Sequence, residues 1–294
     1  TIQVRKLPLK NSLPTTIPFS FKFNSLSSDL SLSLSPSLLS LSLSLSLSKI
    51  KQQLAMNIGI VDSNETYYLY DVTFFNDQIH TLVTHDPSQV NGWISDIENI
   101  HHRRLHRLMV GLDVEWRPNS IPKIKIENPA ATLQLCVGHR CLIFQLLHAS
   151  HFPQSLKDFL GNPNYTFLGV KIHSDVEKLM KDHGLVVAKA VDLGRLAEEH
   201  RRPELRNAGL KILAKEVLGK EVEKRTPVVR SEWDNEWLTP AQVKYACVDA
   251  FLSFEIGRHL KYGNISKKKY GFCRIIMWLV VSWFLMEVLR RVFE

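Results

Sequence analysis

Segment Leu108–Trp116 constrains the fold of this 294-residue chain more than any other stretch. It is an apolar, strand-like run that carries two acids, Asp113 and Glu115. Side chains two apart in a strand point to the same face, so these carboxylates lie side by side, repel each other and lose hydration. A cation bound between them offsets both costs. We therefore expect a core strand that presents a metal-binding pair, with a solvated edge strand as the alternative.

Strand patterns come early in the chain and helical patterns mostly later. Besides Leu108–Trp116, β-forming runs occur at Tyr67–Phe75, Ile79–Thr84, Thr132–Gly138, Cys141–Leu147 and Phe167–Ile172. The first two of these are separated by Asn-Asp, which predicts a hairpin. Helical periodicity marks Pro87–Ile100, Gln154–Leu160, Asp175–His183, Leu193–His200, Gly209–Leu218 and Pro240–Lys261. This order indicates an α/β domain with a mixed β-sheet flanked by helices.

Residues 1–55 are expected to lie outside that domain as a disordered tail. From Ser25 to Ser48 the sequence is almost only Leu and Ser, and such low complexity cannot specify a packed core. Two interpretations stay open. The tail is Ser-rich with few acids, like an organelle transit peptide, although it is poor in Arg; alternatively it is translated non-coding sequence upstream of Met56.

Residues 263–294 form a second flank, a basic linker followed by an apolar run. Ile275–Met286 contains no charged residue, and we expect a terminal helix packed on the domain. A membrane span needs about 20 apolar residues, so a tail anchor is the less favoured alternative. The folded domain is then predicted at residues 56–262.

The net charge of +8 belongs to these flanks. Residues 1–55 hold six Lys or Arg and one acid, residues 258–294 hold eight against two acids, and residues 56–257 are slightly acidic. The high pI is therefore no evidence that the domain binds nucleic acid, and any binding face must be local.

The cysteines and histidines exclude two classes of protein. Four cysteines without CxxC spacing are too few for a secreted disulfide scaffold, which favours reduced thiols and an intracellular protein in the nucleus or cytoplasm. The cluster His101, His102 and His106 lacks the spacing of zinc ligands and is explained by a solvated helix end.

A third acid follows the strand at Phe167–Ile172. Ser174 is expected to cap the next helix, with Glu177 as its capping-box partner. Asp175 then occupies the first helical position just past a strand end, where open α/β sheets bind ligands. The alternative is an acid that only complements the helix dipole.

A fourth acid lies on the last predicted helix of the domain. Thr239 and Pro240 mark its start as cap and first residue. Tyr245 and Asp249 are four apart and share one face of this helix, where the Tyr could hold a water beside the acid. A hydrogen-bonded surface pair explains the two residues equally well.

Together these segments resemble the DEDDy class of 3′→5′ exonucleases, and most closely the Werner-syndrome-like exonucleases of plants. The resemblance covers about Tyr67 to Leu260. Its motifs here are Gly-Leu-Asp-Val-Glu-Trp at 111–116, Ala-Thr-Leu-Gln-Leu-Cys-Val-Gly at 131–138, Gly-Val-Lys-Ile-His-Ser-Asp at 169–175 and Tyr-Ala-Cys-Val-Asp at 245–249.

The resemblance implies a ribonuclease-H-like fold and removal of nucleoside 5′-monophosphates from nucleic-acid 3′ ends, with DNA favoured and a role in DNA repair. It also implies two Mg²⁺ or Mn²⁺ ions held by Asp113, Glu115, Asp175 and Asp249, with Tyr245 orienting the attacking water. The alternatives are an RNA-trimming exonuclease of ribonuclease D type and a non-catalytic nucleic-acid-binding module. Oligomeric state is not predicted.

The predicted nucleic-acid contacts are local. Where the family has Gly, this chain has Lys171, whose bulk is expected to crowd the substrate at a strand edge. Residues 201–230 hold nine Lys or Arg against four Glu and could track phosphates, although a solvated helix face is an equal alternative. Trp116 could stack on the terminal base, but a core position is favoured. The binding residues predicted are Trp116, Lys171, Arg201, Arg202, Arg206, Lys211, Lys224 and Arg225.

Overall fold

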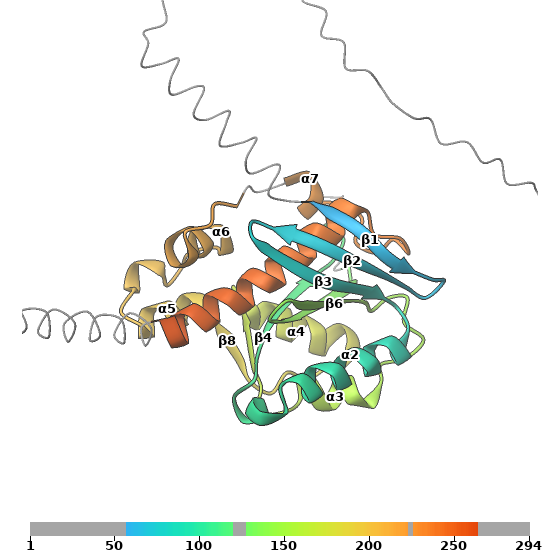
Figure 1. The fold of residues 1–294 in the computed structure, drawn as a ribbon, viewed down its shortest axis with the longest axis horizontal. Coiled ribbons are helices and arrows are strands. Elements are labelled where there is room, and N and C mark those ends of the chain that lie inside the picture. The colour runs from blue at the N-terminus through green and yellow to red at the C-terminus, as the bar shows by residue number, and fades with distance from the viewer. Residues whose placement is uncertain (1–56, 120–127, 223–225, 264–294) are drawn as a thin grey trace, which may run out of the picture. The chain divides into compact units, whose positions relative to one another are not determined.

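The computed structural model describes residues 57–119, 128–222 and 226–263, and in them the predicted mixed sheet is confirmed (Figure 1). The Leu/Ser-rich tail, the apolar run at 275–286, Lys224 and Arg225 lie outside the described residues. The eight strands of the sheet follow the spatial order β1-β2-β3-β6-β5-β4-β7-β8. Their bounds are β1 Ile58–Ser63, β2 Tyr67–Phe74, β3 Asp77–Thr84, β4 Met109–Glu115, β5 Thr132–Val137, β6 Arg140–Gln145, β7 Thr166–Gly169 and β8 Ala190–Asp192.

Antiparallel and parallel pairs alternate in blocks across the sheet. The β2–β3 hairpin pairs antiparallel, with Phe74 opposite Asp77 beside its turn, and β3 then runs parallel to β6. Strand β5 is antiparallel to both of its neighbours, β6 and β4, whereas β4, β7 and β8 are parallel. Strand β4 is therefore central, with a partner on each side, as its apolar sequence predicts.

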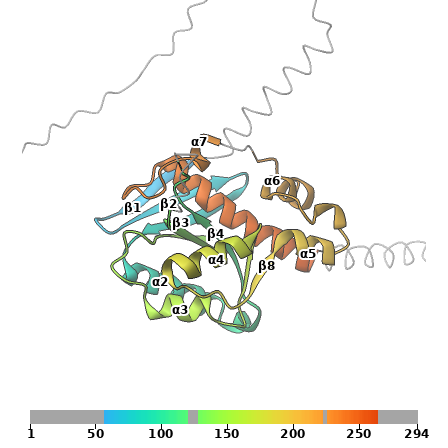
Figure 2. The same cartoon turned by 180° about the vertical axis from the view of Figure 1, so that it is seen from behind.

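Helices cover both faces of this sheet. On one face Phe159 of α3 packs edge-on against Phe167 of β7, and α3 lies beside α2 (Figures 1 and 2). On the opposite face the helix at residues 240–263 packs against β4 and β7. The other helices are α2 Pro87–Ile100, α3 Gln154–Leu160, α4 Ile172–His183, α5 Leu193–Glu199, α6 Leu210–Leu213 and α7 Thr226–Val229, with short 3-10 or π turns η1 His102–Arg107, η2 Pro203–Leu205 and η3 Ala214–Leu218.

Glycine permits the contact between β4 and the 240–263 helix. A Cβ atom at Gly111 would lie 2.0 Å from the carbonyl oxygen of Ala250 and 2.7 Å from the amide nitrogen of Phe254. Backbone therefore meets backbone here, and no side chain fits between them. The start of this helix is as predicted, because Thr239 and Gln242 exchange hydrogen bonds in a capping box.

Two predictions around β7 are wrong. The strand ends at Gly169, and α4 begins at Ile172 rather than Asp175. Lys171, in the left-handed conformation at φ 57°, is the cap residue, so Ser174 lies inside the first turn and does not cap it. Asp175 nevertheless stays in that first turn, just beyond the end of β7.

No helix within the described residues is long and apolar enough to cross a membrane.

Candidate active site

Asp113 and Glu115 lie on the face of β4 that meets the 240–263 helix. Alternation along β4 puts both acids on the same side as Gly111, and Gly111 touches Ala250 of that helix. Asp249, adjacent to Ala250, is thereby brought against the two acids of β4. The close approach at Gly111 therefore positions the fourth acid, and we call Asp113, Glu115, Asp175 and Asp249 the carboxylate site.

The pKa values show that these four acids form one electrostatic cluster. Burial raises the pKa of Asp113 well above its ordinary value, and the charges of Glu115, Asp249 and Asp175 raise it further. Burial together with Asp249 and Asp175 raises the pKa of Glu115 to about 9. Acids from a strand, from α4 and from the 240–263 helix therefore repel one another across one shared volume.

Asp175 and Asp249 have smaller shifts with the same first cause. Burial raises the pKa of each to about 7. The hydroxyl of Tyr245 donates a hydrogen bond to Asp249, which favours the ionised carboxylate and opposes the effect of burial. The pKa of Tyr245 itself is raised, by burial and then by Asp249 and Glu115. Tyr245 therefore remains a hydroxyl donor at neutral pH, next to the acids.

The donor set of the carboxylate site fits divalent cations, although it is not a closed cage. Within the described residues, no three His, Cys, Asp or Glu side chains converge on one point as a complete metal site. Mg²⁺ is ordinarily held by one or two carboxylates, waters and substrate phosphates rather than by an all-protein cage. Four clustered oxygen donors meet this requirement, because added positive charge offsets their burial and relieves the repulsion that raises the pKa values of Asp113 and Glu115 further.

Gln134 is a candidate that the sequence analysis missed. It lies directly opposite Asp113 in the β4–β5 pair and is fully buried. Its amide nitrogen donates to the Thr132 hydroxyl at 2.7 Å, but its carbonyl oxygen has no partner in the structure. Buried acceptors are normally satisfied, so this oxygen is available to whatever occupies the carboxylate site. The signal in the sequence was a Gln inside the apolar strand Thr132–Val137.

Trp116 is not in the core, contrary to the favoured prediction. Its side chain is 36% exposed, and the Lys178 ammonium lies 5.0 Å from the ring centroid. The ring lines a cavity of about 510 Å³, together with Ser174 and Lys178 of α4. The indole ring is therefore accessible beside the carboxylate site, and stacking on a base stays a prediction.

Lys171 shows why a small residue suits its position. At φ 57° the left-handed conformation costs a residue with a Cβ roughly 1–2 kcal/mol, and Gly avoids that cost. The conformation directs the Lys171 amide to a carboxylate oxygen of Asp192 at 2.6 Å, while the side chain is exposed. A small residue therefore suits position 171 because of the backbone geometry at the cap of α4, and not because of the strand edge that was predicted. Whether Lys171 contacts nucleic acid stays a prediction.

The basic stretch 201–230 is partly neutralised within the protein. Arg202 is paired with Glu204 and Glu216, and Arg206 binds both carboxylate oxygens of Glu198. Arg201 and Lys211 are exposed. The predicted phosphate contacts of these four residues remain untested, and the ion pairs reduce the charge that Arg202 and Arg206 present to solvent.

A mixed sheet that carries acids on its central strand, faced by a helix with a further acid and a tyrosine, is the arrangement of the ribonuclease-H-like fold. Residues 79–262 match the 3′-5′ exonuclease domain family. The chain belongs to this family.

Individual relatives support this assignment. The chain is similar to a 3′-5′ exonuclease of Arabidopsis thaliana, with 32% identity over 153 residues, 52% of each sequence. It is 35% identical over 169 residues to the mouse bifunctional 3′-5′ exonuclease/ATP-dependent helicase WRN, over 57% of this chain and 12% of that protein. The similarity thus spans about half or less of these relatives.

A solved structure confirms the fold. The EXO domain of Aedes aegypti Nibbler superposes with a TM-score of 0.50 at 18% identity, over 62% of this chain and 88% of that domain.

Proposed function

We propose that this chain removes nucleoside 5′-monophosphates from 3′ ends, with DNA preferred, by a mechanism that depends on two divalent ions at the carboxylate site. The observation that carries the proposal is the cluster of four acids: burial raises the pKa values of all four, and the neighbouring charges raise those of Asp113 and Glu115 further. Such a cluster is costly to fold and is stabilised by cations. The preference for DNA is what the resemblance to the Werner-syndrome-like exonucleases implies.

Each residue has one part in this mechanism. Asp113 would be shared by two Mg²⁺ or Mn²⁺ ions, Glu115 and Asp249 would help to hold the first ion, and Asp175 would help to hold the second. When bound, the ions lower the pKa of the attacking water and neutralise the leaving oxygen. Tyr245 would hold and orient the water by accepting a hydrogen bond from it, because the one proton of its hydroxyl is donated to Asp249.

Digestion assays test the proposal on the full chain. We expect 3′-recessed DNA to be shortened from its 3′ end in Mg²⁺ and left intact in EDTA. Asp113→Ala should lower the rate by roughly 10²–10³-fold or more while the protein stays folded. Hydrolysis that continues in EDTA, or an Asp113→Ala enzyme with the parent rate, would rule out the metal mechanism.

The same assay with single-stranded RNA addresses the runner-up, an enzyme of ribonuclease D type. Discrimination between the two substrates depends on contacts to the 2′-hydroxyl. Faster removal of ribonucleotides than of deoxyribonucleotides would replace the DNA preference by this alternative. Binding of either strand without any hydrolysis in Mg²⁺ would favour the non-catalytic module.

A further inference from the structure

A second concentration of positive charge lies away from the carboxylate site, in the segment 101–107. Six of its seven residues are His or Arg, and it contains no acid. Most of this segment forms η1, directly before β4, and the side chains of Arg103, Arg104 and Arg107 are exposed. The assigned activity uses none of these residues.

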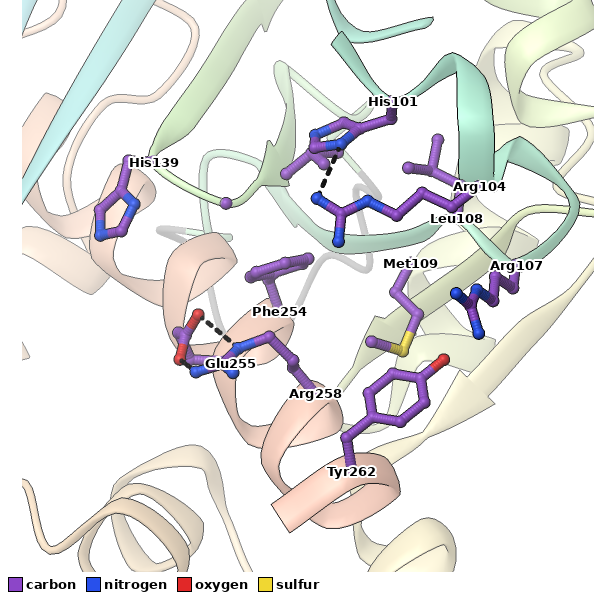
Figure 3. A pocket seen from close by; sticks show the side chains of 12 residues that line it. His101, Arg104, Arg107, Leu108, Met109, His139, Phe254, Glu255, Arg258 and Tyr262 are labelled. Atoms are coloured by element: carbon purple, nitrogen blue, oxygen red, sulfur yellow. Dashed lines mark hydrogen bonds and ion pairs between the residues drawn. The ribbon is translucent and has the colours of Figure 1, made fainter. Parts of the chain in front are cut away.

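Arg104 and Arg107 line a cavity of about 540 Å³. Figure 3 shows the two arginines entering from η1, with Arg258 and Tyr262 on the opposite side, from the 240–263 helix. Phe254 and Met109 form apolar parts of the lining and are almost fully buried. We call this cavity the arginine pocket. Its volume lies in the range of small-molecule sites, about 300–1,000 Å³.

The charges that face the arginine pocket leave a positive excess. Glu255, the one acid in its lining, accepts two hydrogen bonds from Arg258, at 3.0 and 2.5 Å. Arg104 donates to Nδ1 of His101 at 3.2 Å, a bond that keeps its full charge because the acceptor is neutral. For Arg107 the described residues provide no carboxylate within ion-pair distance.

The arginine pocket is separate from the carboxylate site. It adjoins Met109 at the start of β4, whereas Asp113 lies four residues further along, about 13 Å at the rise of a strand. On the 240–263 helix, nine residues separate Asp249 from Arg258, again roughly 13 Å. Phosphates along one strand of duplex DNA are about 3.4 Å apart in axial rise, so this pocket cannot hold the nucleotide that is being cleaved.

We propose that the arginine pocket binds a nucleoside phosphate at a second site. Guanidinium groups of Arg104 and Arg107 match phosphate geometry and donate charge-assisted hydrogen bonds. The ring of Tyr262, which is partly exposed, provides a surface on which a base can stack. The occupant is either a free nucleotide or one nucleotide of a bound strand beyond the cleaved end, since both present the same chemistry.

Binding can be measured independently of hydrolysis. The full chain carrying Asp113→Ala, kept in EDTA, is titrated into fluorescently labelled adenosine 5′-monophosphate and, separately, into a labelled six-nucleotide DNA. Adding Arg104→Ala and Arg107→Ala should weaken binding at least about tenfold, because each removes hydrogen bonds between charged groups. The control is Arg103→Ala, which removes one positive charge from the same exposed segment but lies outside the pocket lining.

The outcomes separate the two sources and decide the proposal. Loss of mononucleotide binding in the Arg104→Ala/Arg107→Ala variant, with the control unchanged, identifies a free nucleotide as ligand. Loss confined to the six-nucleotide DNA identifies a bound strand. If Arg103→Ala weakens binding equally, or if the double variant weakens the binding of neither probe, the proposal that the arginine pocket binds a nucleoside phosphate is wrong. Because hydrolysis is absent from these measurements, a failure here leaves the proposed exonuclease mechanism to its own test.

Discussion

Tyr245 acts on the carboxylate site through a single hydrogen bond. Its hydroxyl donates to Asp249, a carboxylate that burial alone would drive toward its protonated form. The bond favours ionised Asp249, the form that binds a cation. The same hydroxyl faces the acids of β4, whose charges raise its pKa, so it cannot become a phenolate that would add to the repulsion.

Tyr245→Phe should therefore lower kcat by roughly tenfold or more and leave KM nearly unchanged, because a group that only positions water acts in the transition state. Steady-state kinetics on a 3′-recessed duplex measures both constants. Tyr67→Phe is the matched control, since it also removes a Tyr–Asp hydrogen bond, to Asp62 at 2.7 Å on the exposed β1–β2 edge. A Tyr245→Phe enzyme with raised KM and normal kcat would make Tyr245 a binding residue.

Lys171 carries a cost in backbone energy that a substitution can measure. Lys171→Gly should raise the free energy of unfolding by about 0.5–1 kcal/mol, the relief of left-handed strain less the greater chain entropy of Gly. Lys171→Ala keeps the strain and removes only the long side chain, so it should not be stabilised. Urea denaturation compares the three proteins, and equal stability of the Gly and Ala variants would contradict the strain.

The same pair of variants tests crowding of the substrate by the Lys171 side chain. If crowding slows the reaction, Lys171→Gly and Lys171→Ala should both have a higher kcat than the parent. A lower kcat in both variants would mean that the ammonium group assists catalysis. The free energy of unfolding thus reports the backbone strain at Lys171, and kcat reports the effect of its side chain on the substrate.

Between elements, the contact of β4 with the 240–263 helix sets the position of Asp249. Gly111→Ala places a methyl group where the Ala250 carbonyl lies 2.0 Å away, so the helix must move. We expect a loss of stability of about 1–3 kcal/mol. A displacement of about 1 Å at the acids should lower kcat by roughly 10²-fold.

Gly92→Ala is the control for that substitution. Gly92 lies inside α2, and a Cβ atom there meets nothing within 4 Å. Ala in a helix is favoured over Gly by about 0.5–1 kcal/mol, so this variant should be more stable than the parent and equally active. A Gly111→Ala enzyme that resembles it would show that the helix position is not set by Gly111.

Local chemistry explains which elements were predictable from the sequence. The bounds of α2 and the capping box at Thr239 follow from nearest-neighbour rules, and both predictions are confirmed. Strand β8 was missed because three residues, Ala190–Asp192, carry no readable period. Strand β1 was missed because most of its residues are exposed.

The candidate site was only partly predictable, because only some of its features are determined by residues that are neighbours in the sequence. Asp113 and Glu115 stand out because two acids interrupt an apolar strand, a local signal. The end of β7 was misplaced because Val170 and Ile172 continue its apolar pattern, while the left-handed turn at Lys171 depends on the distant Asp192. The contact of Gly111 with Ala250 spans much of the chain, so no local window reveals it.

For the whole molecule, the carboxylate site makes stability depend on pH when metal is absent. The pKa of Glu115 is about 9 when folded, against an ordinary value of 4.5. Between these values the folded protein retains a proton that the unfolded chain releases, so the free energy of unfolding falls as pH rises. In EDTA we therefore expect Tm to decrease from pH 5 to pH 9, and Mg²⁺ to restore it most at the alkaline end.

Glu115→Gln should flatten this dependence and raise Tm at pH 8, because the amide carries no charge in either state. Glu177→Gln, on the exposed side of α4, is the control and should follow the parent curve. Thermal denaturation at several pH values provides the comparison. A metal-free parent protein whose Tm does not change over this window would show that burial and repulsion do not raise the pKa of Glu115 in the folded state.

The order of elements along the chain also has a consequence for synthesis. A nascent chain that has left the ribosome as far as β8 already carries Asp113, Glu115 and Asp175, but neither Tyr245 nor Asp249. These two residues arrive with the last described helix, which must still pack over Gly111. Synthesis therefore leaves the carboxylate site without its fourth acid until this helix has been made and has packed over Gly111, so the proposed hydrolysis can begin only once the domain is complete.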